Sequence, residues 1–392
     1  MRLLHTADWQ IGRQYGRFAP EDAHALAEAR FSAVERLARL ATEQAVAAVL
    51  VAGDVFDAQT VSDRTIRRLF NAMQGFSGPW VMIPGNHDAA LAESVWSRAK
   101  RLGAVPAHVE VLLEPGVYAF PQAGIAVLAA PLTQRQTSAD LTAWFDDAES
   151  PEGLLRLGLA HGSVQGQLAD DIDSPNPIAA ERAARARLHY LALGDWHGLK
   201  QIDERTWYSG TPEQERFKNN GAGQALIVAF EKFDHPPRVT AHQVGKFQWH
   251  HWQETIRVDS DIDRLIERLE ALPSPAVLAL DLRGDTDLAG HRRLTQALAE
   301  AEARHRSVQY DLSALRLQPT DADIAALDAD GYLGDVIDEL RAQQSLQDDE
   351  ASRDALVLLA GLLRERLPQA ASHAEESESG LGMSSLAQED SA

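Results

Sequence analysis

The chain has 392 residues, a net charge of −21 and no cysteine, and 45% of it is hydrophobic, which together indicate a globular protein of two or three domains. The acidic charge excludes a broad, nonspecific coating of nucleic acid, and the lack of cysteine excludes disulfides and thiolate metal ligands. No apolar run approaches the length of a membrane helix and the N-terminus does not resemble a secretory signal, so we expect a cytoplasmic protein without membrane contact.

Residues 2–250 alternate between apolar stretches of strand length and longer stretches with helical spacing. Helices are predicted over 21–44, 63–73 and 91–102, each after a short apolar strand and a polar loop. From residue 109 to residue 230 the chain is rich in predicted strands, which are separated by Gly, Pro and polar turns. This pattern predicts a two-sheet α/β core rather than one doubly wound sheet.

Further regions are expected after this core. Residues 251–318 have the pattern strand–helix–strand–helix–strand, which predicts a small α+β domain, although the strands on both sides of Trp252 could belong together. Residues 319–369 have helical spacing and predict either a partner-docking region or helices that pack on their own domain. Residues 370–392 are acidic, lack Lys and Arg, and predict a disordered tail. The first domain would then be 1–250.

Five polar blocks fall directly after predicted strands, where side chains leave a sheet at one edge. In order they are Asp8-Trp9-Gln10, Gly53 to Asp57, Gly85 to Asp88, His161-Gly162, and Gly194 to Gly198. Each block alone has an ordinary explanation, because Gly-Asp pairs form turns, Asn and Asp cap helices, and single histidines usually serve packing. Five blocks in this order favour a shared metal site, since carboxylate, amide and imidazole groups are ligands for divalent metals.

The ordered blocks resemble those of the calcineurin-like metallophosphoesterases. The segments LLHTADW, GNHD, GDWH and YSGTPEQERF more narrowly resemble the SbcD-type DNA repair exonucleases, which are the nuclease subunits of bacterial double-strand-break repair complexes. The resemblance is strong over 1–250 and weaker over 251–318, which occupies the place of that family's capping domain. It implies an α/β fold, a two-sheet αββα metallophosphoesterase sandwich with a small α+β capping domain and a helical C-terminus.

The resemblance also implies roles for individual residues. One metal would take Asp8, Gln10, Asp54 and His197, and the other would take Asp54, Asn86, His161 and Asp195. The catalytic acid near the leaving group would be His87, and Asp57 would orient it. Two divalent ions are implied, with Mn²⁺ expected and Mg²⁺ as the alternative, and together they would activate a water that attacks the phosphodiester.

Two of these positions depart from the family pattern. Gln10 stands where the family usually has His, and Asp195 stands where the first His of a Gly-His-x-His block is usual. Glutamine offers a neutral carbonyl oxygen or leaves water in its place, and Asp195 adds a negative charge, so these harder ligands favour Mn²⁺ or Mg²⁺ over Zn²⁺. Because Asp54, Asn86 and the histidines are kept, we interpret the pair as a retuned site rather than a decayed one.

Three functions stay open on the sequence. The first is a metal-dependent DNA exo- or endonuclease of DNA repair and recombination, which acts with an SbcC-like coiled-coil ATPase. The second is a metallophosphodiesterase for a small substrate, and the third is a degenerate, non-catalytic scaffold for the ATPase. The capping region and the C-terminal helices favour the first over the second, whereas Gln10 and Asp195 favour the third. The resemblance further implies a homodimer, for which helices within 62–75 and 91–102 are the candidates.

Overall fold

The computed structural model describes residues 1–167, 175–317, 332–347, 351, 355 and 358–359. These residues belong to two compact units. The first unit comprises Met1–His250, Ser274–Leu278 and His305–Ser307, and the second comprises His251–Pro273, Ala279–Arg304 and the described residues from Val308 onward. The expected partner-docking region 319–369 lies outside the described residues, except for helix α8 (Tyr332–Gln347) and the single positions 351, 355, 358 and 359. The expected tail 370–392 lies wholly outside them.

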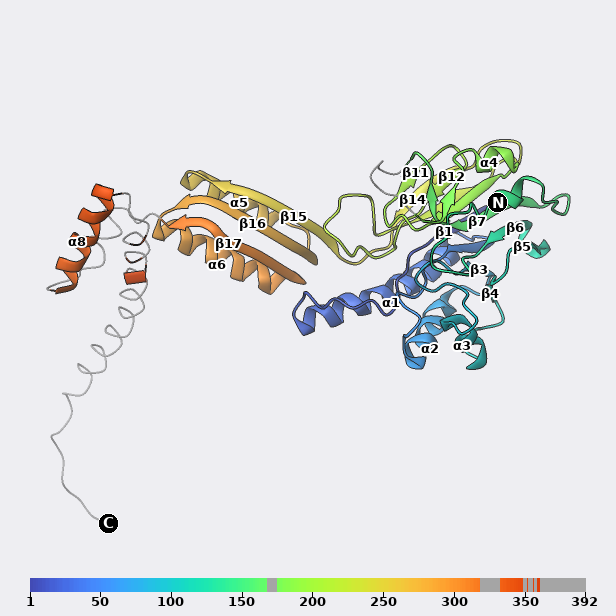
Figure 1. The fold of residues 1–392 in the computed structure, drawn as a ribbon, viewed down its shortest axis with the longest axis horizontal. Helices are drawn as coiled ribbons and strands as arrows, with labels where there is room; N and C mark the ends of the chain where they lie inside the picture. The colour runs from blue at the N-terminus through green and yellow to red at the C-terminus, as the bar shows by residue number, and fades with distance from the viewer. Residues whose placement is uncertain (168–174, 318–331, 348–350, 352–354, 356–357, 360–392) are drawn as a thin grey trace, which may run out of the picture. The chain divides into compact units, whose positions relative to one another are not determined.

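The first unit contains a six-stranded sheet in the order β14-β13-β1-β2-β3-β4 (Figure 1). Its strands are β1 (Arg2–Thr6), β2 (Ala48–Ala52), β3 (Trp80–Ile83), β4 (Val109–Val111), β13 (Gln224–Ala229) and β14 (Arg238–Gln243). Strands β1 to β4 pair in parallel, and β13 pairs antiparallel with β1 and with β14. Parallel neighbours need crossover connections, and these contain the helices α1 (Pro20–Glu43), α2 (Asp63–Ala72) and α3 (Val95–Arg101).

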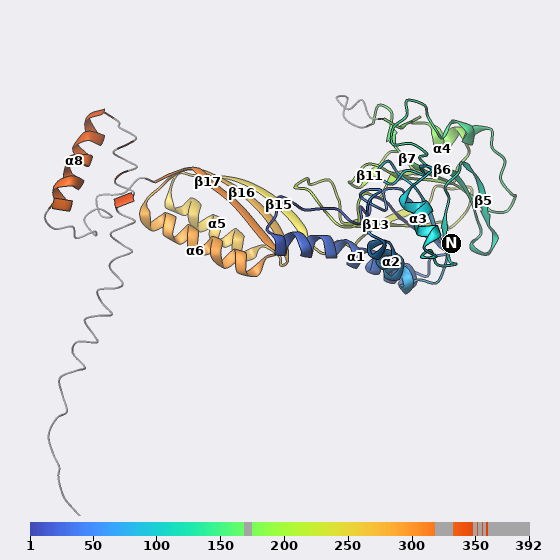
Figure 2. The same ribbon diagram turned by 60° about the horizontal axis from the view of Figure 1, so that its bottom comes forward.

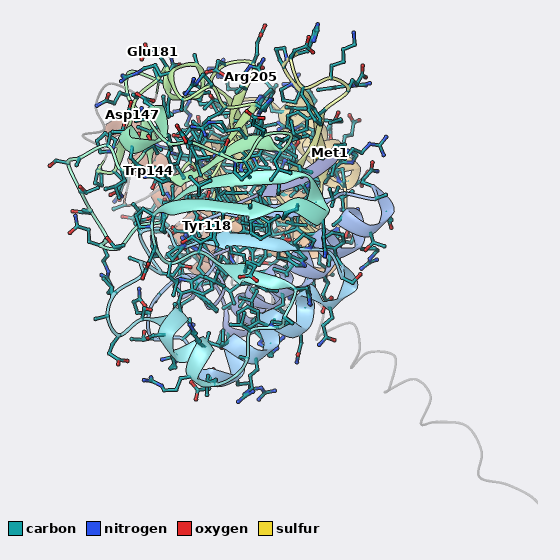
Figure 3. All side chains as sticks on the ribbon, turned by 90° about the vertical axis from the view of Figure 1, so that its right-hand side faces the viewer. Met1, Tyr118, Trp144, Asp147, Glu181 and Arg205 are labelled. Carbon is teal, nitrogen blue, oxygen red and sulfur yellow. The ribbon has the colours of Figure 1, made fainter. Side chains whose placement is uncertain are left out.

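A second six-stranded sheet of the same unit has the order β11-β12-β10-β7-β6-β5. Its strands are β5 (Gly116–Phe120), β6 (Ile125–Ala130), β7 (Leu155–His161), β10 (Tyr190–Gly194), β11 (Lys200–Gln201) and β12 (Thr206–Tyr208). The four central strands are parallel, and β5 and β11 pair antiparallel at the two edges. Figure 3 shows Tyr118 on the edge strand β5. The short strands β8 (Ser163–Val164) and β9 (Pro177–Ile178) pair with each other beside helix α4 (Arg182–Arg185).

Alternation along the strands arranges the first unit in four layers. In β1, Leu4 joins a core with Val34 of α1 and Trp96 of α3. Its neighbour Leu3 joins a second core, between the two sheets, with Leu157 of β7. The outer face of the second sheet packs against a thinner layer that contains α4 and the 3-10 turn η3 (Ala143–Asp146). The expected αββα sandwich is confirmed, and its unbroken apolar strands follow from burial on both faces. Two further 3-10 turns, η1 (Met73–Gly75) and η2 (Pro121–Ala123), directly follow α2 and β5.

The second unit contains most of the predicted strand–helix–strand–helix–strand segment (Figures 1 and 2). Its elements are β15 (Gln248–Ile256), α5 (Asp259–Ala271), β16 (Ala276–Thr286), α6 (Leu288–Arg304) and β17 (Ser307–Leu317), and the strand order is β15-β16-β17. Both helices lie on the same face of the sheet (Figure 2). β15 runs through the expected boundary at 251, because Trp249 at its start packs into an aromatic cluster of the first unit with Tyr15 and Phe18. None of the helices in the described part of the chain is both long and apolar enough to span a bilayer.

Candidate metal centre

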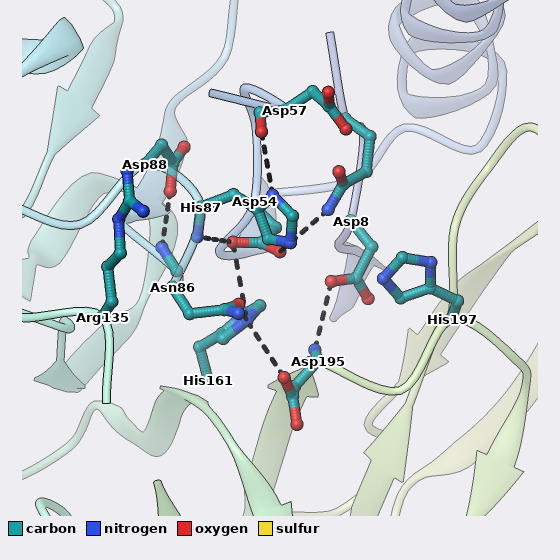
Figure 4. Close-up of polar contacts among 12 residues, drawn as sticks. Asp8, Asp54, Asp57, Asn86, His87, Asp88, Arg135, His161, Asp195 and His197 are labelled. Carbon is teal, nitrogen blue, oxygen red and sulfur yellow. Dashed lines mark hydrogen bonds and ion pairs between the residues drawn. The ribbon is translucent and has the colours of Figure 1, made fainter. Parts of the chain in front are cut away.

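The five polar blocks converge at the carboxyl ends of strands from both sheets of the first unit (Figure 4). Asp8 follows β1 and Asp54 follows β2, while His161 is the last residue of β7 and Asp195 comes directly after β10. Backbone bonds hold the loops together, since Asp8 N–H donates to the Gly53 carbonyl at 3.0 Å. The Asp195 N–H donates to Asp8 Oδ1 at 3.1 Å and so joins the ends of the two sheets.

Three buried residues form the centre of this cluster. One ligand atom from each of Asp8, Asp54 and His161 lies within 4.8 Å of the others, and all three side chains are buried. His161 Nε2 is 3.7 Å from Asp54 Oδ1 and 3.7 Å from Asp195 Oδ1. Asn86 Oδ1 is 2.9 Å from the same Nε2 atom. Carboxylate, amide and imidazole groups at this spacing suit a divalent metal ion.

Glycines make this close approach geometrically feasible. A Cβ atom on Gly85 would lie 2.3 Å from Asp54 Oδ1, and one on Gly53 would lie 2.3 Å from His161 Nδ1. A Cβ atom on Gly194 would lie 2.0 Å from the Ala52 carbonyl oxygen, which itself accepts a hydrogen bond from His161 Nδ1 at 2.8 Å. Any side chain at these positions would therefore push the candidate ligands apart.

The backbone is strained at four candidate ligands. Asp8, Gln10, Asp54 and Asp195 have φ angles of 54°, 49°, 52° and 99°. Only three other non-glycine residues of the described chain have positive φ. Left-handed backbone costs of order 1 kcal/mol or more for such residues and concentrates at functional sites, where the surrounding structure enforces it.

Two oxygen acceptors of the cluster face no donor, which is the observation that tests the fit of a cation. Asp8 Oδ2 and Gln10 Oε1 are buried and have no hydrogen-bond partner. Asn86 is only partly buried, and its amide oxygen already has a contact with His161 Nε2 at 2.9 Å. Buried acceptors without donors are costly, and a positive ion among them removes that cost. The residues present therefore fit a divalent metal.

The pKa shifts of the cluster residues also fit a divalent metal. Burial alone would lower the pKa of His161, but the carboxylates of Asp54, Asp195 and Asp8 raise it to about 9. Burial raises the pKa of Asp8 to about 6, against the opposing effect of His197 and His161. Burial likewise raises the pKa of Asp195. The cluster thus draws protons when it lacks an ion, and metal binding would release them.

His197 is held by a carboxylate that the sequence analysis did not single out. Its Nδ1 atom donates to Glu215 Oε1 at 2.6 Å, and its ring lies beside Asp8 (Figure 4). Glu215 also binds Arg30 at 2.6 Å and Arg13 at 3.1 Å. Burial would raise the pKa of Glu215, but His197, Arg30 and Arg13 hold it well below its ordinary value. Glu215 lies in the quoted segment YSGTPEQERF, but no spacing rule connects it with His197 eighteen residues earlier.

Asp88 is a second carboxylate without a predicted role. It accepts hydrogen bonds from the backbone N–H groups of Gly85, Val55 and Phe56 at 2.7, 3.0 and 3.1 Å. These bonds tie the loop after β3 to the loop after β2. Burial and the nearby Asp54 carboxylate raise the pKa of Asp88 to about 7. Its contacts with backbone groups indicate that it shapes the site rather than binding a ligand.

His87 is partly accessible, with 41% of its side chain exposed. Its Nδ1 atom donates to the backbone carbonyl of Asp57 at 2.8 Å, so the contact with Asp57 comes from the main chain rather than from the predicted carboxylate. The Asp57 carboxylate instead pairs with Arg13 at 3.2 Å. The backbone N–H of His87 donates to Asp54 Oδ1 at 2.9 Å. The Nε2 atom of the His87 ring lies 3.9 Å from Asp54 Oδ2.

Gln10 is fully buried inside the cluster. Its Nε2 atom donates to Asp54 Oδ2 at 2.8 Å, and its backbone N–H donates to the Asp54 carbonyl at 3.0 Å. A histidine at this position would present only one ring nitrogen to the cluster, whereas glutamine presents both an N–H donor and the unpartnered Oε1 acceptor. The side chain therefore orients Asp54, and its Oε1 atom is left without a hydrogen-bond partner.

Comparison with known proteins agrees with the motifs. Residues 1–105 match the family model for calcineurin-like phosphoesterases, a range that includes the first three polar blocks. The SbcD subunit of the SbcCD nuclease of Bacillus subtilis (strain 168) is 25% identical over 274 residues, covering 59% of this chain and 66% of that protein. The SbcD subunit of Rhodobacter capsulatus is 37% identical over 95 residues, covering 23% and 22%.

A third relative is archaeal. The DNA double-strand break repair protein Mre11 of Methanosarcina acetivorans is 24% identical over 318 residues, covering 73% of this chain and 46% of that protein. The chain thus spans 66% or less of the length of each of these curated relatives. The resemblance predicted from the five blocks is confirmed at the level of the phosphoesterase domain.

Proposed function

We propose that this chain, whose first unit carries a calcineurin-like metallophosphoesterase domain, is a metal-dependent DNA nuclease of DNA repair that hydrolyses phosphodiester bonds. The observation that carries the proposal is the pair of buried oxygen acceptors without donors, Asp8 Oδ2 and Gln10 Oε1, beside the Asp8–Asp54–His161 cluster. The names of the three relatives support DNA as the substrate, since two are nuclease subunits and one is a DNA double-strand break repair protein.

The proposed cofactors are two divalent ions, Mn²⁺ or alternatively Mg²⁺. One ion would be held by Asp8, Gln10, Asp54 and His197, and the other by Asp54, Asn86, His161 and Asp195. When bound, such ions lower the pKa of a coordinated water and neutralise charge on the phosphoryl oxygens. The predominance of oxygen ligands supports Mn²⁺ or Mg²⁺ over Zn²⁺.

Three histidines have distinct roles in the proposed mechanism. His161 and His197 each donate through Nδ1, to the Ala52 carbonyl and to Glu215, which leaves Nε2 of each ring for the cluster. His87 also donates through Nδ1, because the Asp57 carbonyl can only accept. The His87 ring therefore carries a transferable proton on Nε2 only in its cationic form, and its exposure lets it reach the departing sugar oxygen.

The proposal includes a partner. The names of two relatives describe a subunit of a nuclease complex, and a coiled-coil ATPase of the SbcC type would supply the basic DNA-binding surface that a chain of net charge −21 does not. The homodimer and the cytoplasmic location stay predictions.

One contact favours the non-catalytic scaffold as the competing function. Gln10 Nε2 donates to Asp54 Oδ2, an oxygen that a bridging carboxylate would otherwise offer to a metal. If this bond persisted in the presence of metal, Asp54 would be a poorer bridge and the second ion would bind weakly.

The deciding experiment uses the purified full chain with Mn²⁺ and linear DNA. We expect degradation of the DNA, its abolition by Asp54→Asn, and a loss of about 100-fold or more with His87→Ala. The exposed Asp147→Asn is the matched control and should retain activity. Cleavage of small phosphodiesters but not of DNA would indicate the small-substrate enzyme. Fewer than one tightly bound metal per chain, with no hydrolysis of either substrate, would indicate the scaffold.

A further inference from the structure

A cavity of about 240 Å³ opens directly beside the candidate metal centre. Two candidate ligands, Asp195 and His197, form part of its wall, together with Trp196, Arg216, Lys218 and Asn220. A molecule held by the metal centre would therefore extend into this cavity. The volume lies just below the range of about 300–1,000 Å³ that is typical of pockets for drug-sized ligands, so it suits one nucleotide unit rather than a longer segment.

The walls of the cavity are fixed by backbone contacts between two loops. Leu199 N–H donates to the Asn220 carbonyl at 2.9 Å, and Thr211 N–H donates to the His197 carbonyl at 3.1 Å. A Cβ atom on Gly198 would lie 2.5 Å from the Asn220 carbonyl oxygen, so only glycine allows this approach. The backbone of the two loops that line the cavity is consequently fixed by the fold.

The charges on the cavity wall favour an anion. Glu215 is neutralised, because Arg30, Arg13 and His197 all contact it. Arg216 touches Glu215 through Nε at 3.2 Å, but 55% of its side chain is exposed. Arg216 and Lys218 thus place two cationic groups on the wall, and the remaining carboxylate there, Asp195, is a proposed metal ligand. Exposed Arg and Lys side chains are the groups that pair with phosphates.

Trp196 supplies an aromatic surface to the same cavity. Its ring packs partly against the apolar core outside the second sheet, and the Lys200 ammonium lies 5.6 Å from the ring centroid. An aromatic side chain beside cationic groups is the combination that binds single-stranded nucleic acid, because bases stack on the ring while phosphates pair with the cations.

We propose that this cavity binds the nucleotide adjacent to the scissile phosphate of a single-stranded DNA end, with the base against Trp196 and a neighbouring phosphate at Arg216 and Lys218. The inference rests on the proposed nuclease function and adds to it a requirement for a substrate with more than one phosphate. It assigns to Trp196, Arg216 and Lys218 a role in holding the strand, separate from the role of the metal ligands.

The probe is a fluorescently labelled single-stranded decathymidylate, whose phosphorothioate linkages resist hydrolysis. Its binding to the full chain is measured by fluorescence anisotropy in the presence of Mn²⁺, over a range of salt concentrations. We expect Lys218→Ala to weaken binding and to reduce the slope of log Kd against log salt by about 0.7, the value for one phosphate contact on a single strand. Trp196→Ala should weaken binding about 5-fold or more, whereas Trp196→Phe, which keeps a ring, should lose less. Lys232→Ala changes an exposed lysine elsewhere and is the matched control.

The outcomes separate this inference from the proposed function. Unchanged affinity and salt slope in both Lys218→Ala and Trp196→Ala, or no binding by the unaltered chain, would overturn the inference. Cleavage of unmodified DNA is measured in parallel. If binding depends on these residues but no DNA is cleaved, the cavity assignment stands and the nuclease proposal fails. If DNA is cleaved but binding does not depend on these residues, only the cavity assignment is rejected.

Discussion

Replacement of Glu215 by Gln is the sharpest test of how this site is supported. Glu215 and Arg30 have only 2% and 1% of their side chains exposed, and their closest atoms are 2.6 Å apart. Solvent cannot screen the Arg30 charge once its partner is neutral, so the free energy of unfolding should fall by about 3–5 kcal/mol. The same change removes the carboxylate that holds His197, which should weaken metal binding by about 10- to 100-fold.

Both effects are measured on the full chain. Urea unfolding of the metal-free protein gives the loss of stability, and titration with Mn²⁺ gives the metal affinity. The matched control is Glu213→Gln, since Glu213 is equally buried and binds Arg36 at 3.0 Å. Glu213 contacts Arg36 and the N–H groups of Lys246 and Phe247, not His197. This control should lose stability but retain metal affinity. Equal metal affinity in the two variants would refute the argument that Glu215 positions His197.

Three further outcomes are expected. Gly85→Ala should abolish tight Mn²⁺ binding, because its Cβ atom would lie 2.3 Å from Asp54 Oδ1. Gly16→Ala is the control and should have no effect, because no atom lies within 4 Å of the added Cβ. Equal Mn²⁺ affinities of the two variants in a metal titration would contradict this prediction. Burial lowers the pKa of His5 to about 3 despite its contact with the Leu193 carbonyl. As the pH falls below about 6.5, the unfolded chain takes up a proton at His5 before the folded chain does. The free energy of unfolding should therefore fall between about pH 6.5 and pH 3. At pH 5 this residue should account for a loss of about 2 kcal/mol relative to pH 8, and a pH profile of urea unfolding that is the same in His5→Gln would show that another group is responsible. Gln10→His should shift the ratio of metal affinities from Mn²⁺ toward Zn²⁺ with little gain in DNA cleavage; a large gain in cleavage without any other loss would count against a retuned site.

The sequence predicted the elements of this protein well because their signals are local. The apolar run at 48–52 and the helical spacing over 21–44 depend only on neighbouring residues, and the structure has β2 at Ala48–Ala52 and α1 at Pro20–Glu43. The two units divide after His250, and β15 continues through that point. Strand continuity there depends on what Trp249 packs against, which is distant in sequence.

The candidate ligands could be found from sequence because each polar block follows a strand, and the carboxyl ends of parallel strands meet at one edge. The sequence by itself therefore determined which residue types are available to a metal, including the two unusual ones, Gln10 and Asp195. What each side chain contacts was decided only by the tertiary structure. Glu215 meets His197, and the carbonyl rather than the carboxylate of Asp57 meets His87. The physical reason is that such contacts join loops from different strands, so their geometry depends on the packing of both sheets and not on spacing along the chain.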